Sequence, residues 1–465
     1  MSNDSSRVGM PRREVFRSLV GASLLMPGLL SQLLAEDASR SDDPLAPKPG
    51  HFPAKAKRVI FVFSNGGASH MDTFDYKPQL FKADGKMMGA GGGLSNQQRV
   101  LLKPLWEFRP GGTCGTLVSD LFPHLRECMD DICVIKSMNG NDNEHYNATL
   151  GMHTGSFFFS RPSIGSWVSY GLGTENQNLP SFIALAPQMP YAGTQIFNND
   201  FLPAYHQGVR VLGGKEPIAD LNRLTKQPGL QELELGLADL LNNQHLKTRA
   251  HDSDLSARIR SFETAFHMQA DAPEAFDVAN ESDATLALYN LKRGESDGFG
   301  WQCLIARRLA ERGVRFIELV DGSSSNNWDQ HGNMAEHADH AKVIDQPLAG
   351  LLKDLKLRNM LDDTLVVWTT EFGRTPGVDG DKGRGHHSAC FSSWMAGGGV
   401  KGGMSYGSTD ELGAVVAENG VHVHDFHATI LHLLGIDHTR LTYRHAGRDY
   451  RLTDVHGKVV QAILS

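Results

Sequence analysis

Short apolar runs alternate with polar, glycine-containing stretches along most of the chain. Residues 58–64 read R-V-I-F-V-F-S, residues 314–320 read V-R-F-I-E-L-V, and residues 364–370 read T-L-V-V-W-T-T. Continuous runs of β-branched and aromatic residues predict strands that are buried on both faces, as in a parallel sheet. Shorter strands are expected at residues 131–136, 181–186 and 391–396.

Between these runs the apolar positions take a helical period. Strands that alternate with helices, with no internal repeat, predict an α/β sandwich. The region 215–292 is rich in charge and helical in pattern, which favours an inserted helical subdomain. His337 and His340 are expected to face solvent, and Asp425 is expected to cap the last helix. The helices are expected at residues 117–129, 163–171, 230–291, 296–312, 335–358 and 425–434.

The first fifty residues differ from the rest of the chain. Arg12 and Arg13 precede a moderately apolar run, Leu19 to Leu34, and a polar, proline-containing stretch follows. This order is typical of an export signal, and the paired arginines favour the twin-arginine route. We therefore expect a signal and flexible linker over 1–50, a folded domain over 55–465, and a periplasmic or extracellular location. A membrane anchor and a disordered tail are the alternatives.

Charge and cysteine content narrow the class of protein. The 465 residues carry a formal net charge of −8, which argues against nucleic acid or an anionic membrane surface as the main partner. A membrane contact is expected only through an uncleaved signal. The five cysteines are scattered without a C-x-x-C pair, so neither a disulfide framework nor a cysteine zinc site is predicted.

Polar side chains follow the ends of three predicted strands. Asn65, His70 and Asp72 come after the first, Asp329 and His331 after the second, and Glu371 after the third, followed by His386 and His387. The carboxyl ends of parallel strands meet at one edge of a sheet, where α/β proteins place their ligands. Carboxylates and imidazoles at such an edge predict a divalent metal site. A glycine turn capped by Asp is the alternative for the first of these groups.

His145 follows the asparagine- and aspartate-rich segment N-G-N-D-N-E and opens a predicted helix. The first turn of a helix that faces the edge of the sheet is suited to an anion. A histidine that only caps a surface helix is the alternative.

Seven stretches together resemble the sulfatase-like family of unknown function numbered 1501, within the alkaline phosphatase and sulfatase superfamily. The resemblance implies a three-layer sandwich with a mostly parallel central sheet. It also implies one or two divalent cations at the ester and a nucleophile at a helix N-terminus. The stretches are S-N-G-G-A-S-H-M-D-T-F-D, H-Y-N-A-T-L-G-M-H-T-G, G-T-E-N-Q-N-L-P-S-F, N-N-W-D-Q-H-G-N, T-T-E-F-G-R-T-P, G-R-G-H-H and Y-R-H-A-G-R-D-Y-R-L-T-D.

The resemblance places half of a two-metal site in this chain. Asp329 and His331 match the first-metal Asp and His, and His386 matches its remaining histidine, with His387 as the alternative. The spacing is D-x-H where the phosphatases have D-x-x-x-H. An extended segment still turns residues i and i+2 to the same side.

The other half departs from the superfamily pattern. Asn65 stands in place of the first-strand Asp, Glu371 and Phe372 in place of an Asp-His pair, and His145 in place of the nucleophile. Formylglycine chemistry is disfavoured because the usual Cys/Ser-x-Pro-x-Arg sequence is absent. The chain could be a single-metal hydrolase that uses His145, a rearranged site that recruits His70 and Asp72, or a catalytically inactive binding protein.

The leading hypothesis is an exported, metal-dependent hydrolase of small-molecule or polysaccharide sulfate or phosphate esters. The cation would be zinc, calcium or manganese. Asp329, His331 and His386 would hold it, with Glu371, Asn65, Asp72 and His387 as further ligands or orienting groups. His145 would act as nucleophile or general acid/base, and Arg374 and Arg384 would contact the anion. The rival is an inactive sulfatase-like component that binds a carbohydrate or polyanion. A mutase of the superfamily lacks its own signal here.

Overall fold

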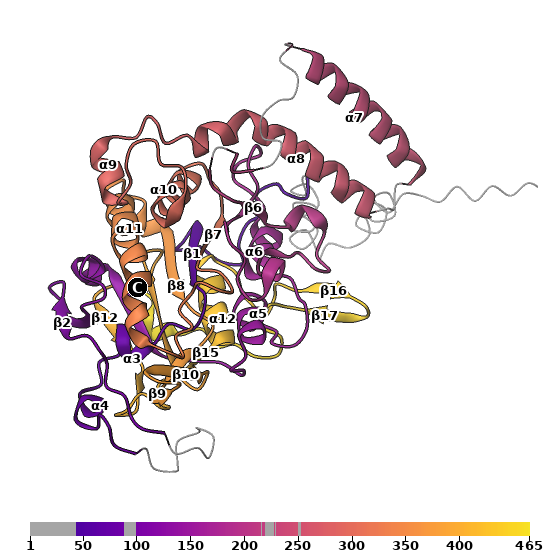
Figure 1. Ribbon diagram of the computed structural model, residues 1–465. Helices are drawn as coiled ribbons and strands as arrows, with labels where there is room; N and C mark the ends of the chain where they lie inside the picture. Colours follow the sequence, from indigo (N-terminus) through magenta and orange to yellow (C-terminus); the bar gives the residue numbers. More distant parts are fainter. Residues whose placement is uncertain (1–42, 88–98, 215, 219–226, 228, 250–252) are drawn as a thin grey trace, which may run out of the picture. The chain divides into compact units, whose positions relative to one another are not determined.

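The computed structural model describes residues 43–87, 99–214, 216–218, 227, 229–249 and 253–465 (Figure 1). Residues 47–465 form one compact unit. The segments that predicted the export signal, Arg12–Arg13 and Leu19–Leu34, lie outside the described residues. Within the described part of the chain, no helix has the length and apolar character needed to cross a membrane.

A nine-stranded sheet forms the centre of this unit, in the order β12-β4-β11-β8-β1-β7-β5-β6, with β15 paired to β4. All pairs are parallel except those made by β11 with β4 and β8. The predicted fold class, an α/β sandwich with a mostly parallel sheet, is confirmed. The strands are β1 (Arg58–Ser64), β4 (Ile132–Asn139), β5 (Phe182–Leu185), β6 (Val209–Val211), β7 (Phe316–Asp321), β8 (Thr364–Thr369), β11 (Phe391–Ala396), β12 (Met404–Tyr406) and β15 (Val421–His422).

The central strand β1 shows why the apolar runs become buried strands. Ile60 and Val62 belong to the apolar core on one face of the sheet, and Phe61 and Phe63 belong to the core on the other face. Successive side chains of a strand point to opposite faces, so a strand covered on both sides needs apolar residues at every position. The sheet therefore lies between two helical layers.

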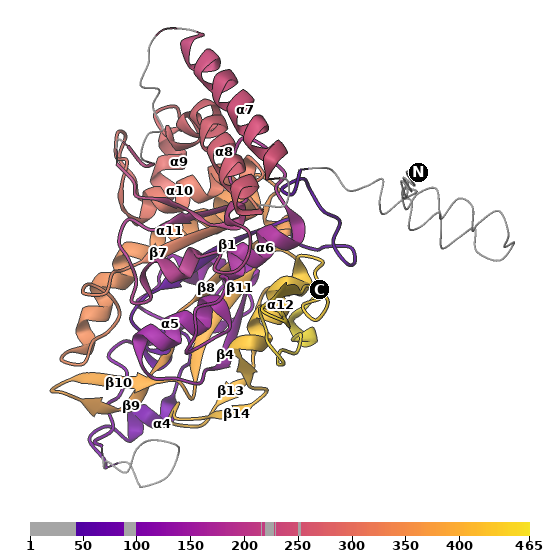
Figure 2. The same cartoon turned by 90° about the vertical axis from the view of Figure 1, so that its right-hand side faces the viewer.

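Helices α8 (Ser253–Phe276), α9 (Asp283–Leu288), α10 (Gly298–Glu311) and α11 (His337–Leu357) supply the core on one face. Helices α5 (His145–Thr154), α6 (Ile164–Leu172) and α12 (Val423–Leu433) supply it on the other (Figure 1, Figure 2). Helix α7 (Leu230–Thr248) precedes α8. The helical content predicted for residues 230–291 is confirmed, whereas an insertion over 215–292 with its own boundaries stays a prediction.

Three local predictions are wrong. Residues 117–129 are not a helix: β3 (Thr116–Ser119) pairs with β2 (Phe108–Gly111), and a 3-10 helix follows over Leu125–Asp131. His337 is fully buried, and its Nε2 accepts a hydrogen bond from the Ser69 N–H at 3.1 Å. His422, not Asp425, caps α12, and Asp425 accepts the reciprocal bond of a capping box from the His422 N–H.

Because of the strand directions, the loops that carry most of the predicted site residues lie at one edge of the sheet. Strands β1, β7 and β8 are parallel, and β4 runs the same way because β11 is antiparallel to both β4 and β8. Their carboxyl ends lead to Asn65, to the loop that carries Asp329, to Glu371 and to the start of α5. The β9–β10 hairpin, Gly373–Asp379 and Gly383–His387, follows β8 and brings His386 to the same edge.

Candidate metal centre

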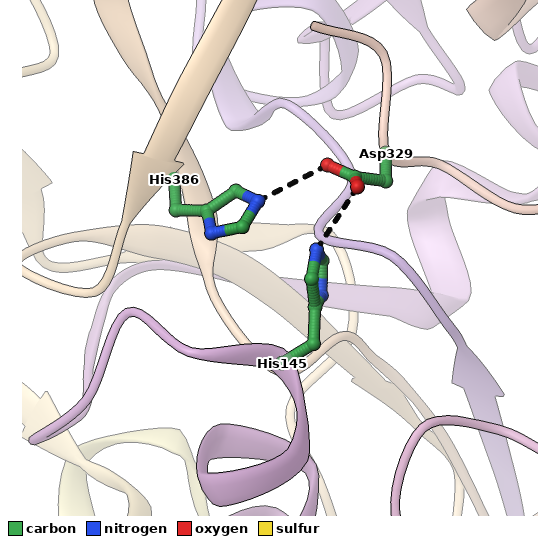
Figure 3. A group of neighbouring side chains, drawn as sticks. All are labelled: His145, Asp329 and His386. Atoms are coloured by element: carbon green, nitrogen blue, oxygen red, sulfur yellow. Dashed lines mark hydrogen bonds and ion pairs between the residues drawn. The ribbon is translucent and has the colours of Figure 1, made fainter. Parts of the chain in front are cut away.

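Three polar residues from distant parts of the chain converge at this edge (Figure 3). His145 opens α5, Asp329 lies in the loop after β7, and His386 lies on β10. Each offers a ligand atom, and these three atoms lie within 4.8 Å of one another.

The carboxylate of Asp329 is at the centre of the group. Its Oδ1 lies 2.9 Å from Nε2 of His331 and 3.1 Å from Nε2 of His386, and these two nitrogens are 2.8 Å apart. Its Oδ2 lies 3.2 Å from Nε2 of His145. The predicted set Asp329, His331 and His386 is thus brought together around one oxygen, and His145 faces the other.

The opposite nitrogen of each imidazole faces an acceptor. Nδ1 of His145 is 2.7 Å from Oε1 of Glu371. Nδ1 of His331 is 2.6 Å from Oδ2 of Asp379, and Nδ1 of His386 is 2.7 Å from the Asn143 carbonyl. Carboxylates and carbonyls only accept hydrogen bonds here, so all three Nδ1 atoms donate. In the neutral tautomers the Nε2 lone pairs then point toward Asp329, which is how proteins orient histidines that bind metals.

The donor set fits a divalent cation. Two neutral imidazoles whose Nε2 atoms are 2.8 Å apart would repel each other unless a proton or a cation lies beside them. Nε2 of His145 is buried without a hydrogen-bond partner, although it lies within ion-pair distance of Asp329. Three carboxylates, on Asp329, Glu371 and Asp379, lie around the group with two guanidiniums, of which Arg374 pairs with Asp329 and Arg99 with Asp379. One negative charge is left for a cation to balance.

The same contacts change the pKa values of His145 and Asp329. Burial lowers the pKa of His145, but Asp329 and Glu371 outweigh burial, so the net shift is upward. Burial raises the pKa of Asp329, yet His145, His386 and Arg374 hold that pKa well below its usual range. Asp329 is therefore ionised throughout the physiological range and available as a ligand.

Glu371 is an orienting group in this structure. Its side chain is 1% exposed and accepts from the Gly66 N–H at 2.8 Å, from the Thr370 hydroxyl at 3.0 Å, and from His145. The close approach needs glycine at position 66, where φ is +109° and a Cβ atom would come within 2.6 Å of the loop after β7. The turn after β1 thus fixes the carboxylate that fixes His145.

Arg374 donates a hydrogen bond to the central carboxylate, that of Asp329. Its side chain is fully buried, and its donors bond to Asp329 and to the carbonyls of Gly66, Gly67 and Arg384. The guanidinium therefore connects the turn after β1 to Asp329. This geometry favours a positioning role, and contact of Arg374 with a substrate anion stays a prediction.

The structure places four of the other predicted site residues away from the cluster. Arg384 is fully buried and bonds to Oδ2 of Asp72 at 2.8 Å and to three backbone carbonyls. Nε2 of His387 faces the Ala414 carbonyl at 2.6 Å, and the Asn65 amide donates to the Ser323 carbonyl at 2.7 Å. His70 faces the Gly413 carbonyl, so the arrangement that recruits His70 and Asp72 is not formed.

Arg384→Met is expected to lower the free energy of unfolding by about 3–5 kcal/mol, because it leaves the Asp72 carboxylate buried without its charged partner. Denaturant unfolding measures the effect. Lys356→Met is the matched control, since the ion pair of Lys356 with Asp131 is largely exposed and its loss should change stability by less than about 1 kcal/mol. Equal losses in the two variants would contradict the structural role assigned to Arg384.

Sequence reasoning missed three residues of the centre, Asp379, Asn143 and Tyr191, and named Phe372 only as a departure from the superfamily pattern. Asp379 and Asn143 orient two imidazoles, Tyr191 stacks on His145 with ring centroids 4.0 Å apart, and Phe372 packs against His145 and His386. Asp379 lies seven residues before His386 in a glycine-containing segment, so a hairpin predicted over 373–387 could have placed it near the same edge, where its side chain contacts His331. Nothing in the local sequence marks Tyr191 or the Asn143 carbonyl.

The chain belongs to the family described as "Protein of unknown function (DUF1501)", whose model matches residues 56–464. The predicted family is therefore confirmed. No curated protein matches the chain.

Three solved structures illustrate what the fold is similar to. A sulfatase from Pseudoalteromonas sp. is 14% identical with a TM-score of 0.35, over 92% of this chain and 72% of that one. Alkaline phosphatase from the Antarctic bacterium TAB5 is 11% identical with a TM-score of 0.35, over 82% and 98%. A phosphonate monoester hydrolase from Silicibacter pomeroyi is 10% identical with a TM-score of 0.35, over 89% and 76%. Similarities of this size do not define an activity.

Proposed function

We propose that the protein is a metal-dependent hydrolase of sulfate or phosphate esters. The observation that carries the proposal is the convergence of three oriented imidazoles on the Asp329 carboxylate at the carboxyl edge of the sheet. The motif order, which resembles the alkaline phosphatase and sulfatase superfamily, supports the same reaction class. The substrate would be a small-molecule or polysaccharide ester.

Asp329, His331 and His386 would hold the cation. Their imidazole nitrogens and single carboxylate favour zinc or manganese over calcium, which prefers an all-oxygen set. When bound, such a cation supplies a Lewis acid that polarises the ester and favours ionisation of an attacking water. Glu371 and Arg374 keep the ligands in place through their own buried hydrogen bonds.

His145 would move the proton. Glu371 fixes its Nδ1–H, so Nε2 is the nitrogen available to accept a proton from water or to donate one to the leaving group. Tyr191 and Phe372 cover the imidazole on its ring faces, which limits its rotation. A role as nucleophile or as a further ligand is the alternative that the variants discussed below distinguish.

A catalytically inactive protein that binds a carbohydrate or polyanion is the second candidate. It is favoured because the donors of both buried arginines already bond to protein acceptors, those of Arg374 to Asp329 and backbone carbonyls and those of Arg384 to Asp72 and backbone carbonyls, which does not place either to stabilise the charge of a reacting ester. In the part of the chain that the structure describes, the group of metal-ligand side chains contains no cysteine.

Metal content and ester hydrolysis test the proposal together. The purified chain is loaded with zinc or manganese, its metal content is measured, and it is then assayed against aryl sulfates and aryl phosphates. Hydrolysis that requires the cation supports the hydrolase. About one cation per chain without turnover of either ester class favours the inactive binding protein, and failure to bind any divalent cation contradicts both the metal centre and the mechanism.

Metal affinity is expected to fall as the pH falls, beginning above pH 6.5. The raised pKa of His145 means that a proton starts to occupy the centre at a higher pH than an ordinary histidine would allow. The affinity falls rather than rises because the protonated His145 imidazole places positive charge beside Asp329 and so competes with the cation. Calorimetric titration of zinc between pH 5.5 and 8 measures this, and an affinity that stays constant over that range would contradict it.

Export through the twin-arginine route is proposed from the N-terminal sequence alone, and with it a periplasmic or extracellular location. Fusion of residues 1–50 to a reporter, with Arg12 and Arg13 both changed to Lys as the matched variant, tests the route. The unchanged fusion is expected outside the cytoplasm and the variant inside. An equal distribution of the two would reject the twin-arginine route.

A further inference from the structure

Five leucines on one side of α7 form an exposed apolar surface, which we call the leucine face. Each of these residues is between 39% and 73% exposed. Residues three and four apart on a helix lie on the same side, so the five side chains make one strip along about three turns. The members of the leucine face are Leu230, Leu233, Leu237, Leu240 and Leu241.

The opposite side of α7 faces α8. Its half-buried residues are Gln231, Leu235, Asn242 and Leu246. Nε2 of Gln231 donates a hydrogen bond to Oε1 of Gln269 on α8, 2.6 Å away. At about 100° per residue, this side of the helix lies roughly opposite the leucine face. In both views α7 lies on the outer side of α8, so the leucine face points away from the helix that α7 packs against (Figure 1, Figure 2).

This distribution of leucines favours a protein partner. A helix that is apolar on two opposite sides is typical of a helix with a neighbour on each side. Single exposed leucines are common on protein surfaces, whereas a contiguous apolar strip marks an interaction surface. The net charge of −8 and the exposed carboxylates of Glu234 and Asp239 on α7 argue against an anionic membrane surface as the occupant.

Spacing and charge both fit a second copy of α7 itself. The first four leucines of the face are three, four and three residues apart, which is the spacing of a coiled-coil seam that packs against a similar seam. The exposed Glu234 and Asp239 lie in the first half of α7, and the exposed Lys247 and Arg249 lie at its end. Two antiparallel copies place the acidic half of each helix beside the basic end of the other and oppose the two helix dipoles. Such a surface complements itself under a two-fold rotation.

We propose that the leucine face binds the same face of a second copy of this chain, with the two α7 helices antiparallel. The 19 residues of α7 span about 28 Å, so two strips about 10 Å wide bury on the order of 600 Å² together. Stable specific interfaces bury about 1,200–2,000 Å². The dimer is therefore expected to be weak and to form at micromolar concentrations. No residue of α7 belongs to the metal centre, so the proposal does not depend on hydrolysis there.

Sedimentation velocity of the full chain between about 1 and 100 µM, a range that brackets a micromolar dissociation constant, tests the proposal. We expect the sedimentation coefficient to rise with concentration toward that of a dimer. The double variant Leu237→Gln/Leu240→Gln should raise the dissociation constant at least about tenfold, because it removes four leucines from the contact while glutamine keeps the helix propensity. Leu357→Gln is the matched control. Leu357 is 75% exposed at the end of α11, so this variant should dimerise as the unchanged chain does.

Cysteine crosslinking tests the direction of the two helices. The background is Cys114→Ser, which removes the exposed native cysteine. In an antiparallel pair centred on the leucine face, position 237 lies near its own copy, whereas position 230 lies about 20 Å from its copy, beyond the reach of a disulfide. Mild oxidation is expected to link Leu237→Cys chains into dimers and to leave Leu230→Cys chains unlinked. Equal linkage of the two variants would reject the antiparallel arrangement.

Melting temperatures establish that the variants are folded, as expected for changes of exposed side chains. Dimerisation that is lost in Leu237→Gln/Leu240→Gln and kept in Leu357→Gln supports the proposal. The proposal is overturned if the unchanged chain stays monomeric over the whole concentration range, or if the double variant dimerises as strongly as the unchanged chain. A monomeric chain that binds phosphatidylcholine vesicles through the same two leucines would overturn it in favour of a membrane surface.

Discussion

His386→Ala is expected to lose the metal. The unchanged chain should carry about one zinc or manganese ion, and the variant less than about a tenth of this after dialysis. The change removes one imidazole from Oδ1 of Asp329 and leaves His331 without its neighbour. Loss of only an orienting partner commonly costs 10–100-fold in metal affinity, so loss of a ligand should cost at least about 100-fold. Elemental analysis and calorimetric titration measure the change.

His387→Ala is the matched control for this prediction. It removes an imidazole one position along the same strand, but Nε2 of His387 faces the Ala414 carbonyl, outside the cluster. The control should retain the metal, with a lower melting temperature because His387 is buried. Retention of metal by His386→Ala, or equal loss in the two variants, would contradict the ligand set. Asp329→Asn should behave as His386→Ala does.

His145→Gln is expected to abolish most of the hydrolysis while the metal stays bound. General acid/base catalysis by a positioned histidine contributes about 10²–10⁴-fold, so kcat/KM toward the ester cleaved by the unchanged chain should fall by that factor. Nε2 of His145 faces Oδ2 of Asp329, on the opposite side of the carboxylate from His331 and His386. Steady-state kinetics and elemental analysis of one preparation test both halves of the prediction.

Glu371→Gln provides the graded comparison. The amide can still accept from the Gly66 N–H, but it lacks the charge that orients the His145 imidazole. We expect a smaller loss of activity, about 10–100-fold, and a pH profile displaced toward lower pH, because one of the carboxylates that raise the pKa of His145 is gone. If His145→Gln loses the metal together with the activity, His145 is a ligand and not the acid/base.

The predictions of the fold succeeded where the local pattern is strong. The strands predicted at 58–64 and 364–370 are examples. Within these two runs, residues 59–63 and 365–368 are apolar at every position, and this reflects a sheet that is covered on both faces. The helix predicted over residues 117–129 was wrong because a stretch with apolar residues at helical spacing can also form a short hairpin and a 3-10 turn. The predicted exposure of His337 was wrong because tertiary packing places its side chain against Trp328 and Ser69.

At the candidate metal centre, too, some residues could be named from the sequence, whereas the partners of others could not. Asp329, His331 and His386 could be named from strand ends and spacing, and the structure brings them within hydrogen-bond distance of one another. Asp72 and Arg384 carry the same chemistry in the sequence, yet they form a buried ion pair with each other elsewhere. Residue type indicates what a side chain can do, whereas its partners depend on contacts between segments that lie hundreds of positions apart.

The sequence by itself determined the alternation of strands and helices, the family, and the edge of the sheet at which carboxylates and histidines would gather. These properties follow from local periodicity and from the fixed direction of parallel strands. Only the tertiary structure decided which groups orient the imidazoles, because Glu371, Asp379 and the Asn143 carbonyl reach His145, His331 and His386 across 226, 48 and 243 positions of sequence. The tertiary structure alone also placed the ring of the tail residue His456 beside that of His424.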